Sequence, residues 1–314
     1  MLLDTSRFNL VKDDGKWLEN LVEADGESRL LTSDSDVAQG LLRQFAPPAH
    51  NALTLPWNEA HDSVRFLPGK TTIWSGPTFS GKTQFLRQLM LWALKGDQRV
   101  FFASLEEEPV EVYREFISTC AHRRDPSRQF IEWCLDTWDQ RLFVFDSTEM
   151  ISPERLLGLA QFAAKKYGIT HVVIDSLMRL SLRMDDYEGQ RQMGNLISRV
   201  ARLAGVHIHL VAHPRKTLNS RQSMDLYDIR GAQDIIAQAD LVVTLERKHG
   251  EDRQCDAELT VWKQRGDINW IGTMRLHYDR PSRQLKYRAY DAPMRFLPDE
   301  AYEGAASCVP ELPL

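Results

Sequence analysis

The sequence has few cysteines, no long apolar run and no excess of basic residues, and each absence excludes a class of protein. The cysteines lie far apart and form no C-x-x-C pair, so we expect neither a disulfide framework nor a zinc site; they are Cys120, Cys134, Cys255 and Cys308. Every apolar stretch is interrupted by charge or glycine well before the roughly 18 residues that a membrane-spanning helix needs. The amino-terminal residues lack a secretory apolar block and are too acidic for a mitochondrial transit peptide. These absences predict a soluble, cytoplasmic protein without a membrane partner.

Charge is nearly balanced along most of the chain. The formal net charge is −5 over 314 residues, and residues 1–60 alone hold ten acids against five bases, which accounts for the whole excess. The chain is therefore no polycation, and any contact with nucleic acid must come from local basic loops. With 43% hydrophobic and 26% charged residues, the composition is that of a globular protein with a sizeable buried core.

Short β-branched runs alternate with longer amphipathic stretches from residue 70 onward. Five of these runs are almost continuously apolar, which is typical of strands buried on both faces of a parallel sheet: residues 71–76, 99–105, 141–147, 171–176 and 205–213. Four later runs, joined by short turns, predict antiparallel hairpins: residues 241–247, 257–265, 268–278 and 283–290. The sequence therefore predicts an α/β fold whose mainly parallel sheet continues into antiparallel hairpins toward the carboxyl terminus.

Composition divides the chain into three parts. Residues 1–62 are rich in acids and contain one predicted helix at residues 35–45, so we expect an accessory segment or linker. Residues 63–290 hold the predicted α/β domain. Residues 291–314 are acidic and contain several prolines, and we expect them to form a flexible tail.

Residues 76–83, GPTFSGKT, match the phosphate-binding pattern G-x-x-x-x-G-K-[ST] and stand between a predicted strand and a predicted helix. The two glycines permit the backbone angles that turn several N–H groups toward one anion, at the positive end of the following helix. Lys82 would reach the β and γ phosphates, and the Thr83 hydroxyl would hold Mg²⁺. The alternative is a glycine-rich turn with an exposed lysine. We therefore predict a nucleotide cradle made of Gly76, Pro77, Thr78, Phe79, Ser80, Gly81, Lys82 and Thr83.

Two carboxylates that follow predicted strands would complete this chemistry. Asp175 ends the apolar run HVVID, and a parallel strand delivers it to the sheet edge at which Thr83 lies, so it is the candidate second metal ligand. Glu106 follows the run FFASL and is the candidate general base that orients water. Glu107 and Glu108 compete for that role. A strand-capping aspartate and a solvated acidic turn are the alternatives.

His213 ends the run 205–213 at the next position along the same edge, where it would sense the γ phosphate; a core histidine is the alternative. His207 and His209 lie deeper in that strand, and we expect them to be core histidines. The loop that follows is basic, with no acid until Asp225, and favours contact with a nucleic-acid backbone over a merely solvated loop. The candidate nucleic-acid contacts are Arg215, Lys216, Asn219, Arg221 and Gly231.

Five ordered blocks resemble the RecA-fold motor domain of the DnaB-like replicative helicases, closest in pattern to the phage primase-helicases and the mitochondrial helicase Twinkle. The blocks are LPGKTTIWSGPTFSGKT, FFASLEEEP, HVVIDSL, HIHLVAHPRK, and DIRGAQDIIAQADLVVTLER followed by TVWKQR, and they cover residues 67–290. The resemblance implies a RecA-like P-loop NTPase core. It also implies that Glu106 is the catalytic base, Asp175 the metal carboxylate and His213 a γ-phosphate sensor coupled to DNA.

The resemblance further implies an active site shared between subunits. Lys263 and Arg265 of TVWKQR would reach the nucleotide of a neighbouring copy. Arg247 and Tyr278 match the family pair that sandwiches the nucleotide base. Without the family, the first two are ordinary charges on an edge strand and the second two are surface residues of a hairpin. The helix at residues 35–45 would dock on the next subunit, although packing on its own domain is the alternative.

Two departures from the family pattern stand out. The polar sensor that usually precedes the closing aspartate of the RG block is replaced by Ala237, with Gln233 and Gln238 nearby, so the role of these glutamines is open. Phe79 stands in the cradle where a small residue is common, and its ring would narrow the nucleotide pocket.

We therefore expect a 5′ to 3′ replicative DNA helicase of a bacterial or phage-infected cell. It would encircle single-stranded DNA as a homo-oligomeric, hexameric ring and hydrolyse ATP, or another NTP or dNTP, with Mg²⁺. A primase, a polymerase or a single-strand-binding protein would be its partner. A filament-forming RecA-type recombination or repair ATPase is an alternative, and so is a non-catalytic nucleotide-gated adaptor or loader. The joint presence of Lys82, Thr83, Glu106, Asp175 and Arg265 argues against the adaptor.

Overall fold

The structure is a computed structural model that describes residues 52–146, 151–176, 187–213, 233–248, 254–266 and 268–303. In these ranges nine strands form one sheet in the order β11-β10-β9-β8-β3-β7-β6-β4-β5. The strands are β3 (Thr71–Ser75), β4 (Val100–Ser104), β5 (Leu142–Val144), β6 (His171–Asp175), β7 (His207–Val211), β8 (Leu241–Arg247), β9 (Ala257–Gln264), β10 (Gly272–Asp279) and β11 (Gln284–Lys286). Pairing is parallel from β8 to β5 and antiparallel from β8 to β11. The predicted fold class is confirmed.

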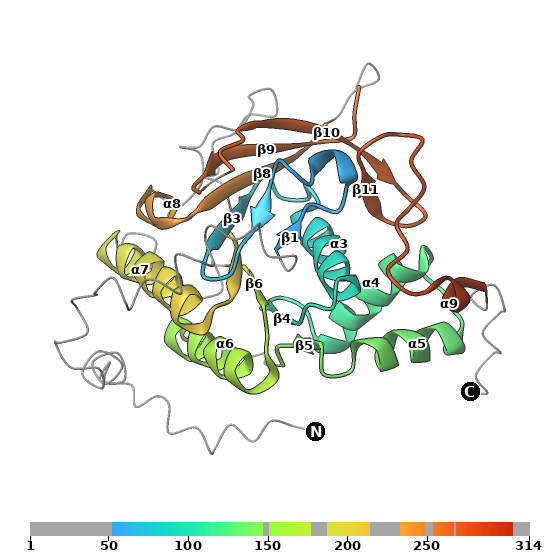
Figure 1. The fold of residues 1–314 in the computed structure, drawn as a ribbon, viewed down its shortest axis with the longest axis horizontal. Coiled ribbons are helices and arrows are strands. Elements are labelled where there is room, and N and C mark those ends of the chain that lie inside the picture. Colours follow the sequence, from blue (N-terminus) through green and yellow to red (C-terminus); the bar gives the residue numbers. More distant parts are fainter. Residues whose placement is uncertain are drawn as a thin grey trace, which may run out of the picture.

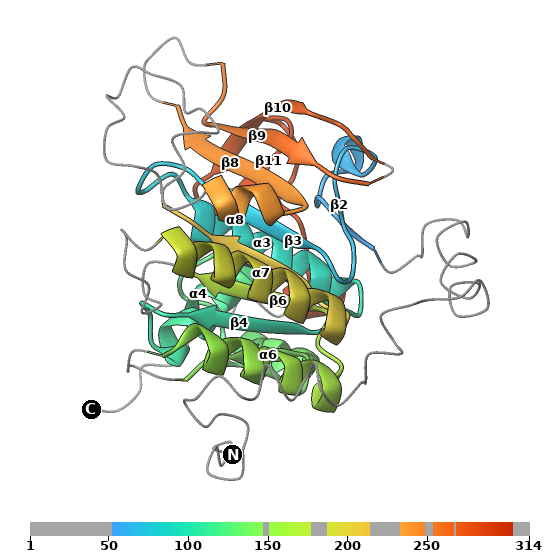
Figure 2. The ribbon, with the colours of Figure 1, turned by 90° about the vertical axis from the view of Figure 1, so that its left-hand side faces the viewer.

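Helices cover both faces of the sheet (Figure 1). One face carries α3 (Lys82–Lys95), α4 (Pro109–Ala121) and α5 (Arg128–Trp138), and the other carries α6 (Pro153–Tyr167), α7 (Tyr187–Ala204) and α8 (Gln233–Gln238). Figure 2 looks onto the second face, with α6, α7 and α8 in front of the strands. Successive residues of a strand point to opposite faces, so Ile73 of β3 packs toward α6 and α7 whereas Trp74 packs toward α3. Burial on both faces explains why these strands are almost continuously apolar.

Local signals fix where the helices begin and end. The Ser152 hydroxyl accepts a hydrogen bond from the Arg155 N–H at 3.3 Å just before α6, and Pro153 takes the first helical position, where no N–H is needed. The helix ends at Gly168, whose φ of 68° suits glycine. Helix α3 ends at Gly96, as the sequence predicts. None of the helices in the described ranges combines the length and hydropathy that would let it cross a membrane.

The packed domain begins earlier than the expected boundary at residue 62. Strand β1 (Leu53–Thr54) pairs with β2 (Arg65–Phe66) across that boundary, and a short 3-10 helix, η3 (Asn58–Ala60), lies between them. Trp57 stacks on Phe85 with 5.6 Å between ring centroids and donates its Nε1–H to the Leu285 carbonyl at 3.1 Å. Residues 53–60 therefore belong to the core that α3 covers, whereas the predicted helix at 35–45 lies outside the described residues.

The described part of the expected tail is packed, because residues 294–302 lie on α4 and α5, whereas residues 304–314 lie outside the described residues. Phe296 and Leu297 are buried, and the short helix α9 (Asp299–Glu303) brings the ring of Tyr302 edge-on to that of Phe130, at 5.4 Å between centroids. A few apolar side chains spaced along an acidic segment are enough to hold it, and composition alone conceals them.

Three histidines form part of the buried sheet: His171 on β6 and His207 and His209 on β7. Trp74 donates its Nε1–H to His209 Nδ1 at 3.2 Å, and an indole N–H can only donate, so His209 carries its own proton on Nε2. That proton is donated to His171 Nδ1 at 3.2 Å, and His171 Nε2 donates to the Gln98 side-chain oxygen at 2.6 Å. All three rings are neutral, and the expectation that His207 and His209 are core histidines is confirmed.

This cluster predicts a loss of stability in mild acid. Burial lowers the pKa of His207 to about 4 and holds those of His171 and His209 well below their ordinary value of 6.5. Below pH 6.5 the unfolded chain binds protons that the folded chain does not, so stability is fully present above pH 6.5 and falls toward pH 4. We expect the free energy of unfolding to fall by about 1.4 kcal/mol per pH unit for each histidine.

Urea unfolding at pH 7, 6 and 5 would measure this loss. His207→Gln removes one titrating group and should make the dependence on pH shallower. Equal free energies of unfolding at pH 7 and pH 5 in the unmodified protein would contradict the prediction.

Candidate active site

The predicted cradle follows β3 and leads into α3. Gly76 has a φ of 147°, and a Cβ atom there would lie 2.1 Å from the carbonyl oxygen of Leu245 on β8, so the position accepts only glycine. Gly81, with a φ of 93°, is the residue from which α3 begins. Phe79 has a positive φ of 64°, and its side chain is 90% exposed. The ring therefore points into solvent, and the expectation that it narrows the pocket is wrong for this structure.

Lys82 bonds to the loop that precedes it. Its Nζ donates to the carbonyl oxygens of Gly76 and Pro77, both at 2.8 Å, and lies 3.4 Å from Ser80 Oγ. Burial lowers the pKa of Lys82 to about 8, and the charge of Asp175 opposes this shift. The amine is therefore still charged at neutral pH, at the helix end where backbone N–H groups attract an anion.

Thr83 and Asp175 meet at the carboxyl edge of the sheet. The Thr83 hydroxyl donates to Asp175 Oδ2 at 2.5 Å, and Asp175 is buried. Burial raises the pKa of Asp175, while Thr83, Arg87 and Lys82 act to lower it. The hydroxyl of the next residue, Ser176, is buried and has no hydrogen-bond partner among the described residues. Two hydroxyls and a carboxylate suit Mg²⁺, which takes its remaining ligands from phosphates and water. In the described ranges, no cluster of three or more His, Cys, Asp or Glu side chains would hold a metal by itself.

Glu106 and His213 lie near the cradle residues, as the mutual effects on their pKa values indicate. Glu106 follows β4, and after burial its charge also raises the pKa of Asp175. Burial lowers the pKa of His213 and so does Lys82, whereas Asp175 and Glu106 raise it. Because β3, β4, β6 and β7 are parallel, their carboxyl ends lie along one edge. The structure thus brings together Lys82, Glu106, Asp175 and His213.

Lys263 and Arg265 lie at the opposite edge of the sheet. Lys263 Nζ donates to the carbonyl oxygens of Ile236 and Ala237, at 2.6 and 2.9 Å, and Arg265 Nη2 donates to that of Ala237 at 2.8 Å. The Arg265 N–H bonds to the Asp240 carbonyl beside the start of β3, whereas the cradle follows the end of β3. At about 3.3 Å per residue, the length of β3 separates these two ends by roughly 16 Å. In their own chain, both cations hold the end of α8.

Burial lowers the pKa of Lys263 to about 8, and the neighbouring charge of Arg265 adds to this effect. Gln238, at the end of α8, donates its side-chain N–H to the Arg191 carbonyl at 3.3 Å, and the Ala237 side chain is exposed. The Gln238 amide is thus bonded to α7. At position 237, where the family pattern has a polar side chain, the backbone carbonyl of Ala237 accepts the hydrogen bonds of Lys263 and Arg265.

Arg247 and Tyr278 lie at the same edge as the cradle. Arg247 on β8 and Leu276 on β10 both pair with Ala257 of β9, so they occupy one row of the sheet. Tyr278 is two residues beyond Leu276 and therefore projects to the same face. That face carries α3, and Leu245, which approaches the cradle, is two residues before Arg247. Both residues are exposed, Tyr278 to 37%.

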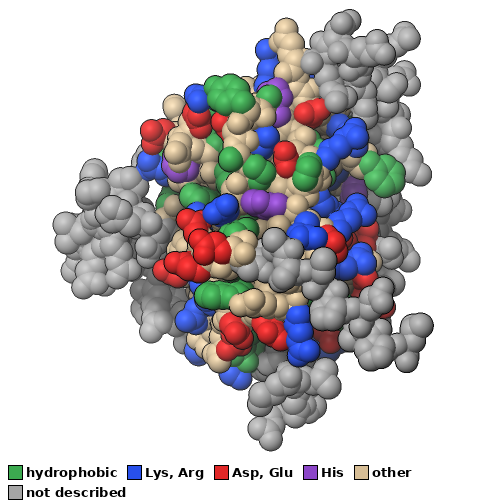
Figure 3. Space-filling view, turned by 90° about the vertical axis from the view of Figure 1, so that its right-hand side faces the viewer, with side chains coloured by type: hydrophobic (Ala, Val, Ile, Leu, Met, Phe, Trp, Pro, Cys, Tyr) green, Lys and Arg blue, Asp and Glu red, His purple; other side chains and the backbone are tan. Residues whose placement is uncertain are grey.

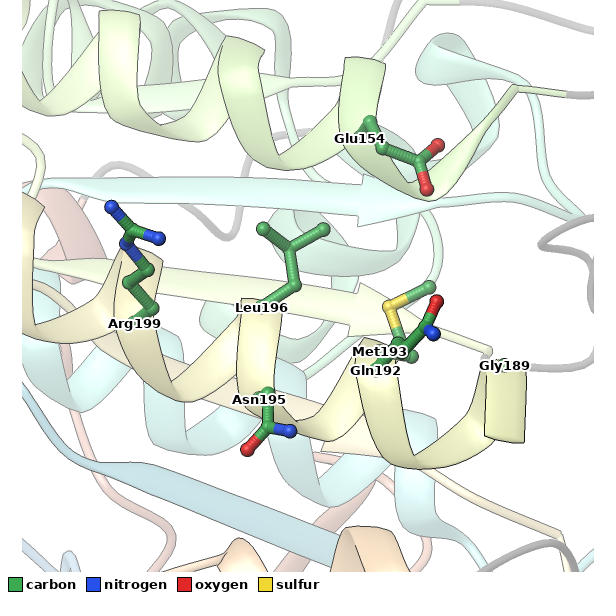
Figure 4. A pocket seen from close by; sticks show the side chains of 7 residues that line it. All are labelled: Glu154, Gly189, Gln192, Met193, Asn195, Leu196 and Arg199. Carbon is green, nitrogen blue, oxygen red and sulfur yellow. The ribbon is translucent and has the colours of Figure 1, made fainter. Parts of the chain in front are cut away.

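The predicted nucleic-acid contacts lie outside the described residues: Arg215, Lys216, Asn219, Arg221 and Gly231. A cavity of about 360 Å³ opens between α6 and α7, where Leu196 and Arg199 extend toward the helix that carries Glu154 (Figure 4). The full lining is Glu154, Gly189, Gln192, Met193, Asn195, Leu196 and Arg199. None of the predicted site residues lines this cavity, so the candidate active site is the cradle edge.

The fold and the cradle edge define a P-loop nucleotide-binding protein. A family model described as an AAA domain matches residues 61–219, half of the chain, and the chain belongs to this family. An AAA domain implies ATP binding.

Two solved structures share the fold. The ATPase domain of G40P matches with a TM-score of 0.66 at 16% identity, over 81% of this chain and 98% of that one. A DnaB-like replicative helicase, solved for its interactions with primase, matches with a TM-score of 0.68 at 17% identity, over 86% of this chain and 72% of that one. Identities this low establish the fold alone, which is RecA-like, and they confirm the resemblance seen in the sequence at that level.

Gly76→Ala tests the cradle directly. The added Cβ would collide with the Leu245 carbonyl and push the loop away from β8, so we expect ATP affinity to fall by at least about 100-fold. Gly158→Ala on α6 is the matched control, because no atom of the described residues lies within 4 Å of the new Cβ. It should leave affinity unchanged and stabilise the helix by about 1 kcal/mol. Titration with a fluorescent ATP analogue and thermal unfolding measure both effects. Unchanged affinity in Gly76→Ala would show that the loop is not a cradle.

Proposed function

We propose that this protein is a DNA helicase that moves 5′ to 3′ along single-stranded DNA as a hexameric ring and hydrolyses ATP, or another NTP or dNTP, at the seams between copies. One observation carries the proposal. The cradle, the buried carboxylate, the exposed glutamate and the histidine converge at one edge of the sheet, whereas Lys263 and Arg265 lie at the opposite edge. A second copy can bring its opposite edge against this cradle, and the fold shared with a DnaB-like helicase supports the same arrangement.

Each residue at the cradle edge has a role in this reaction. The loop N–H groups and Lys82 bind the β and γ phosphates, and Glu106 orients a water and accepts its proton. Thr83 and Asp175 would hold Mg²⁺, which when bound with nucleotide neutralises charge on the phosphate oxygens. Burial and the charge of Lys82 lower the pKa of His213, and this residue acts as the sensor of the γ phosphate.

The cation from the second copy completes the site. Arg265 of that copy stabilises the charge that develops on the transferred phosphoryl group, an effect that reaches several powers of ten in rate. Arg247 and Tyr278 receive the base by stacking, which is indifferent to base identity. Hydrolysis then depends on assembly, because no single chain holds all of these groups at one edge.

DNA would be held by the basic loop that begins after His213. On the side of α5, α9 and β11, Figure 3 shows acidic and basic side chains intermixed, so the described residues of this face form no continuous basic track. Binding through a few loop cations to phosphates should weaken steeply with salt. The helix at residues 35–45 would dock on the next copy, and a primase, polymerase or single-strand-binding protein would act beside the ring.

Replacing Lys82 with alanine tests the motor. Loss of the amine removes the charge that holds the β and γ phosphates, so we expect unwinding of a forked duplex to fall by about 100-fold or more. Lys95→Ala, at the exposed far end of the same helix, is the control and should unwind at the normal rate. Normal unwinding by Lys82→Ala would rule the mechanism out.

Mass measurement with nucleotide and single-stranded DNA gives the subunit number, and electron microscopy distinguishes rings from filaments.

Mixing two inactive variants tests whether the cation acts across a seam. Lys82→Ala supplies an intact Arg265 and Arg265→Ala supplies an intact cradle, so random assembly of equal amounts restores about a quarter of the seams. We expect DNA-stimulated hydrolysis to return to about a quarter of the normal rate, although each variant alone is inactive. A mixture no more active than its parts, or an Arg265→Ala protein that is fully active alone, would contradict a shared site.

A further inference from the structure

The three consecutive glutamates after β4 have different surroundings. Glu107 forms an ion pair with Arg87, whose side chain is only 5% exposed, and accepts a hydrogen bond from Ser104 Oγ at 3.2 Å. Glu106 and Glu108 are exposed, and of the two it is Glu106 whose charge acts on Asp175. The carboxylate of Glu107 is therefore bonded within the protein, whereas the exposed carboxylate of Glu106 is near enough to Asp175 for its charge to act there.

Arg87 links three elements beneath this turn. It lies on α3, one helical turn after Thr83, so it projects from the same side of the helix. Its guanidinium reaches Glu107 at the end of β4 and lies 4.0 Å from Glu115 on α4. Glu115 in turn forms an ion pair with Arg283, in the turn between β10 and β11.

The backbone on the other side of Glu106 is also fixed. The Leu105 N–H donates to the Asp175 carbonyl at 2.8 Å, which ties the end of β4 to the strand that carries the metal carboxylate. Glu106 is thus held between Leu105, bonded through its backbone, and Glu107, bonded through its side chain. Freeing either neighbour would let the glutamate move relative to Asp175.

The charge of Arg87 also matters at this edge. Glu106 and Asp175 carry like charges, which disfavour one another, and the charge of Glu106 raises the pKa of Asp175 after burial has done so. Beside the dominant effect of burial, which raises the pKa of Asp175, Arg87 acts to lower it. A buried ion pair usually contributes little net stability, because both ions lose their hydration. We therefore attribute to the Arg87–Glu107 ion pair a role in fixing the backbone of the turn after β4.

We propose that Arg87 and Glu107 are positioning residues that fix the turn after β4 so that Glu106 faces the nucleotide. This rests on the proposed function, in which Glu106 is the catalytic base. Arg87 orients the turn through Glu107 and does not itself touch the nucleotide.

Glu107→Gln tests this assignment, because glutamine keeps the size of the side chain and an acceptor for Arg87 but loses the ion pair. A base displaced by about 1 Å loses up to about 100-fold in rate, so we expect kcat for DNA-stimulated ATP hydrolysis to fall by about 10- to 100-fold. KM and the melting temperature should hardly change. Glu108→Gln makes the same charge change one residue later and should hydrolyse normally. Arg87→Lys, which cannot span both carboxylates, should resemble Glu107→Gln.

A double-mutant cycle separates positioning from a general structural role. If Glu107 acts through Glu106, then Glu107→Gln added to Glu106→Gln should lower kcat no further, as measured in single turnovers with radiolabelled ATP. An equal further loss in the double variant, or normal kcat in Glu107→Gln alone, would overturn the proposal. If Glu106→Gln alone hydrolyses ATP at the normal rate, the base assignment within the proposed function is what fails.

Discussion

The contact between the Thr83 hydroxyl and the buried carboxylate of Asp175 is the interaction on which the candidate site depends. Thr83 belongs to the unit of β3, cradle and α3, whereas Asp175 ends β6, and β7 lies between the two strands in the sheet. Holding these two side chains together brings the cradle across the end of β7, so His213, two residues beyond β7, must lie beside them. Parallel pairing makes this possible, because it places every carboxyl end at one edge.

Burial favours the neutral form of both the cationic and the anionic side chain at this edge. It lowers the pKa of Lys82 to about 8 and raises that of Asp175, so each group is shifted toward its neutral form. The ionised forms are satisfied best by partners of opposite charge, and a polyphosphate with a divalent cation supplies both at once. The loop carbonyls of Gly76 and Pro77 accept hydrogen bonds from the Lys82 amine. The edge thus suits a ligand that carries a dense negative charge, such as a nucleoside triphosphate, and in the proposed reaction Mg²⁺ would accompany it.

The sequence predicts this edge well because its polar residues belong to short local sequence motifs. GPTFSGKT, HVVID and FFASLEEE each place a polar group at the end of an apolar strand, and the structure finds Lys82, Asp175 and Glu106 together. Arg87 was missed, since a lone arginine on the helix after the cradle resembles a surface charge, and its partners are 20 and 28 positions away. The spacing of four residues from Thr83 was the available signal. Composition also placed Trp57 and Phe296 in peripheral segments, because contacts between distant parts of a chain leave no trace in local composition. The strand order, with β7 and β6 between β3 and β4, is likewise set by tertiary packing.

The end of α8 lies at the edge of the sheet opposite the cradle. Lys263 and Arg265 hold its last carbonyl groups, which have no partner within the helix, and together they stabilise its negative end. In the proposed ring, Arg265 can turn toward a second copy's nucleotide only by leaving the Ala237 carbonyl, and Lys263 would then hold the helix end alone. The chain that enters α8 comes from the basic loop after His213. In that proposal, capture of the cation by a neighbour's phosphate would free the Ala237 carbonyl at the end of this short helix. The alanine at position 237 suits this arrangement, because the group that responds is a backbone carbonyl and needs no polar side chain.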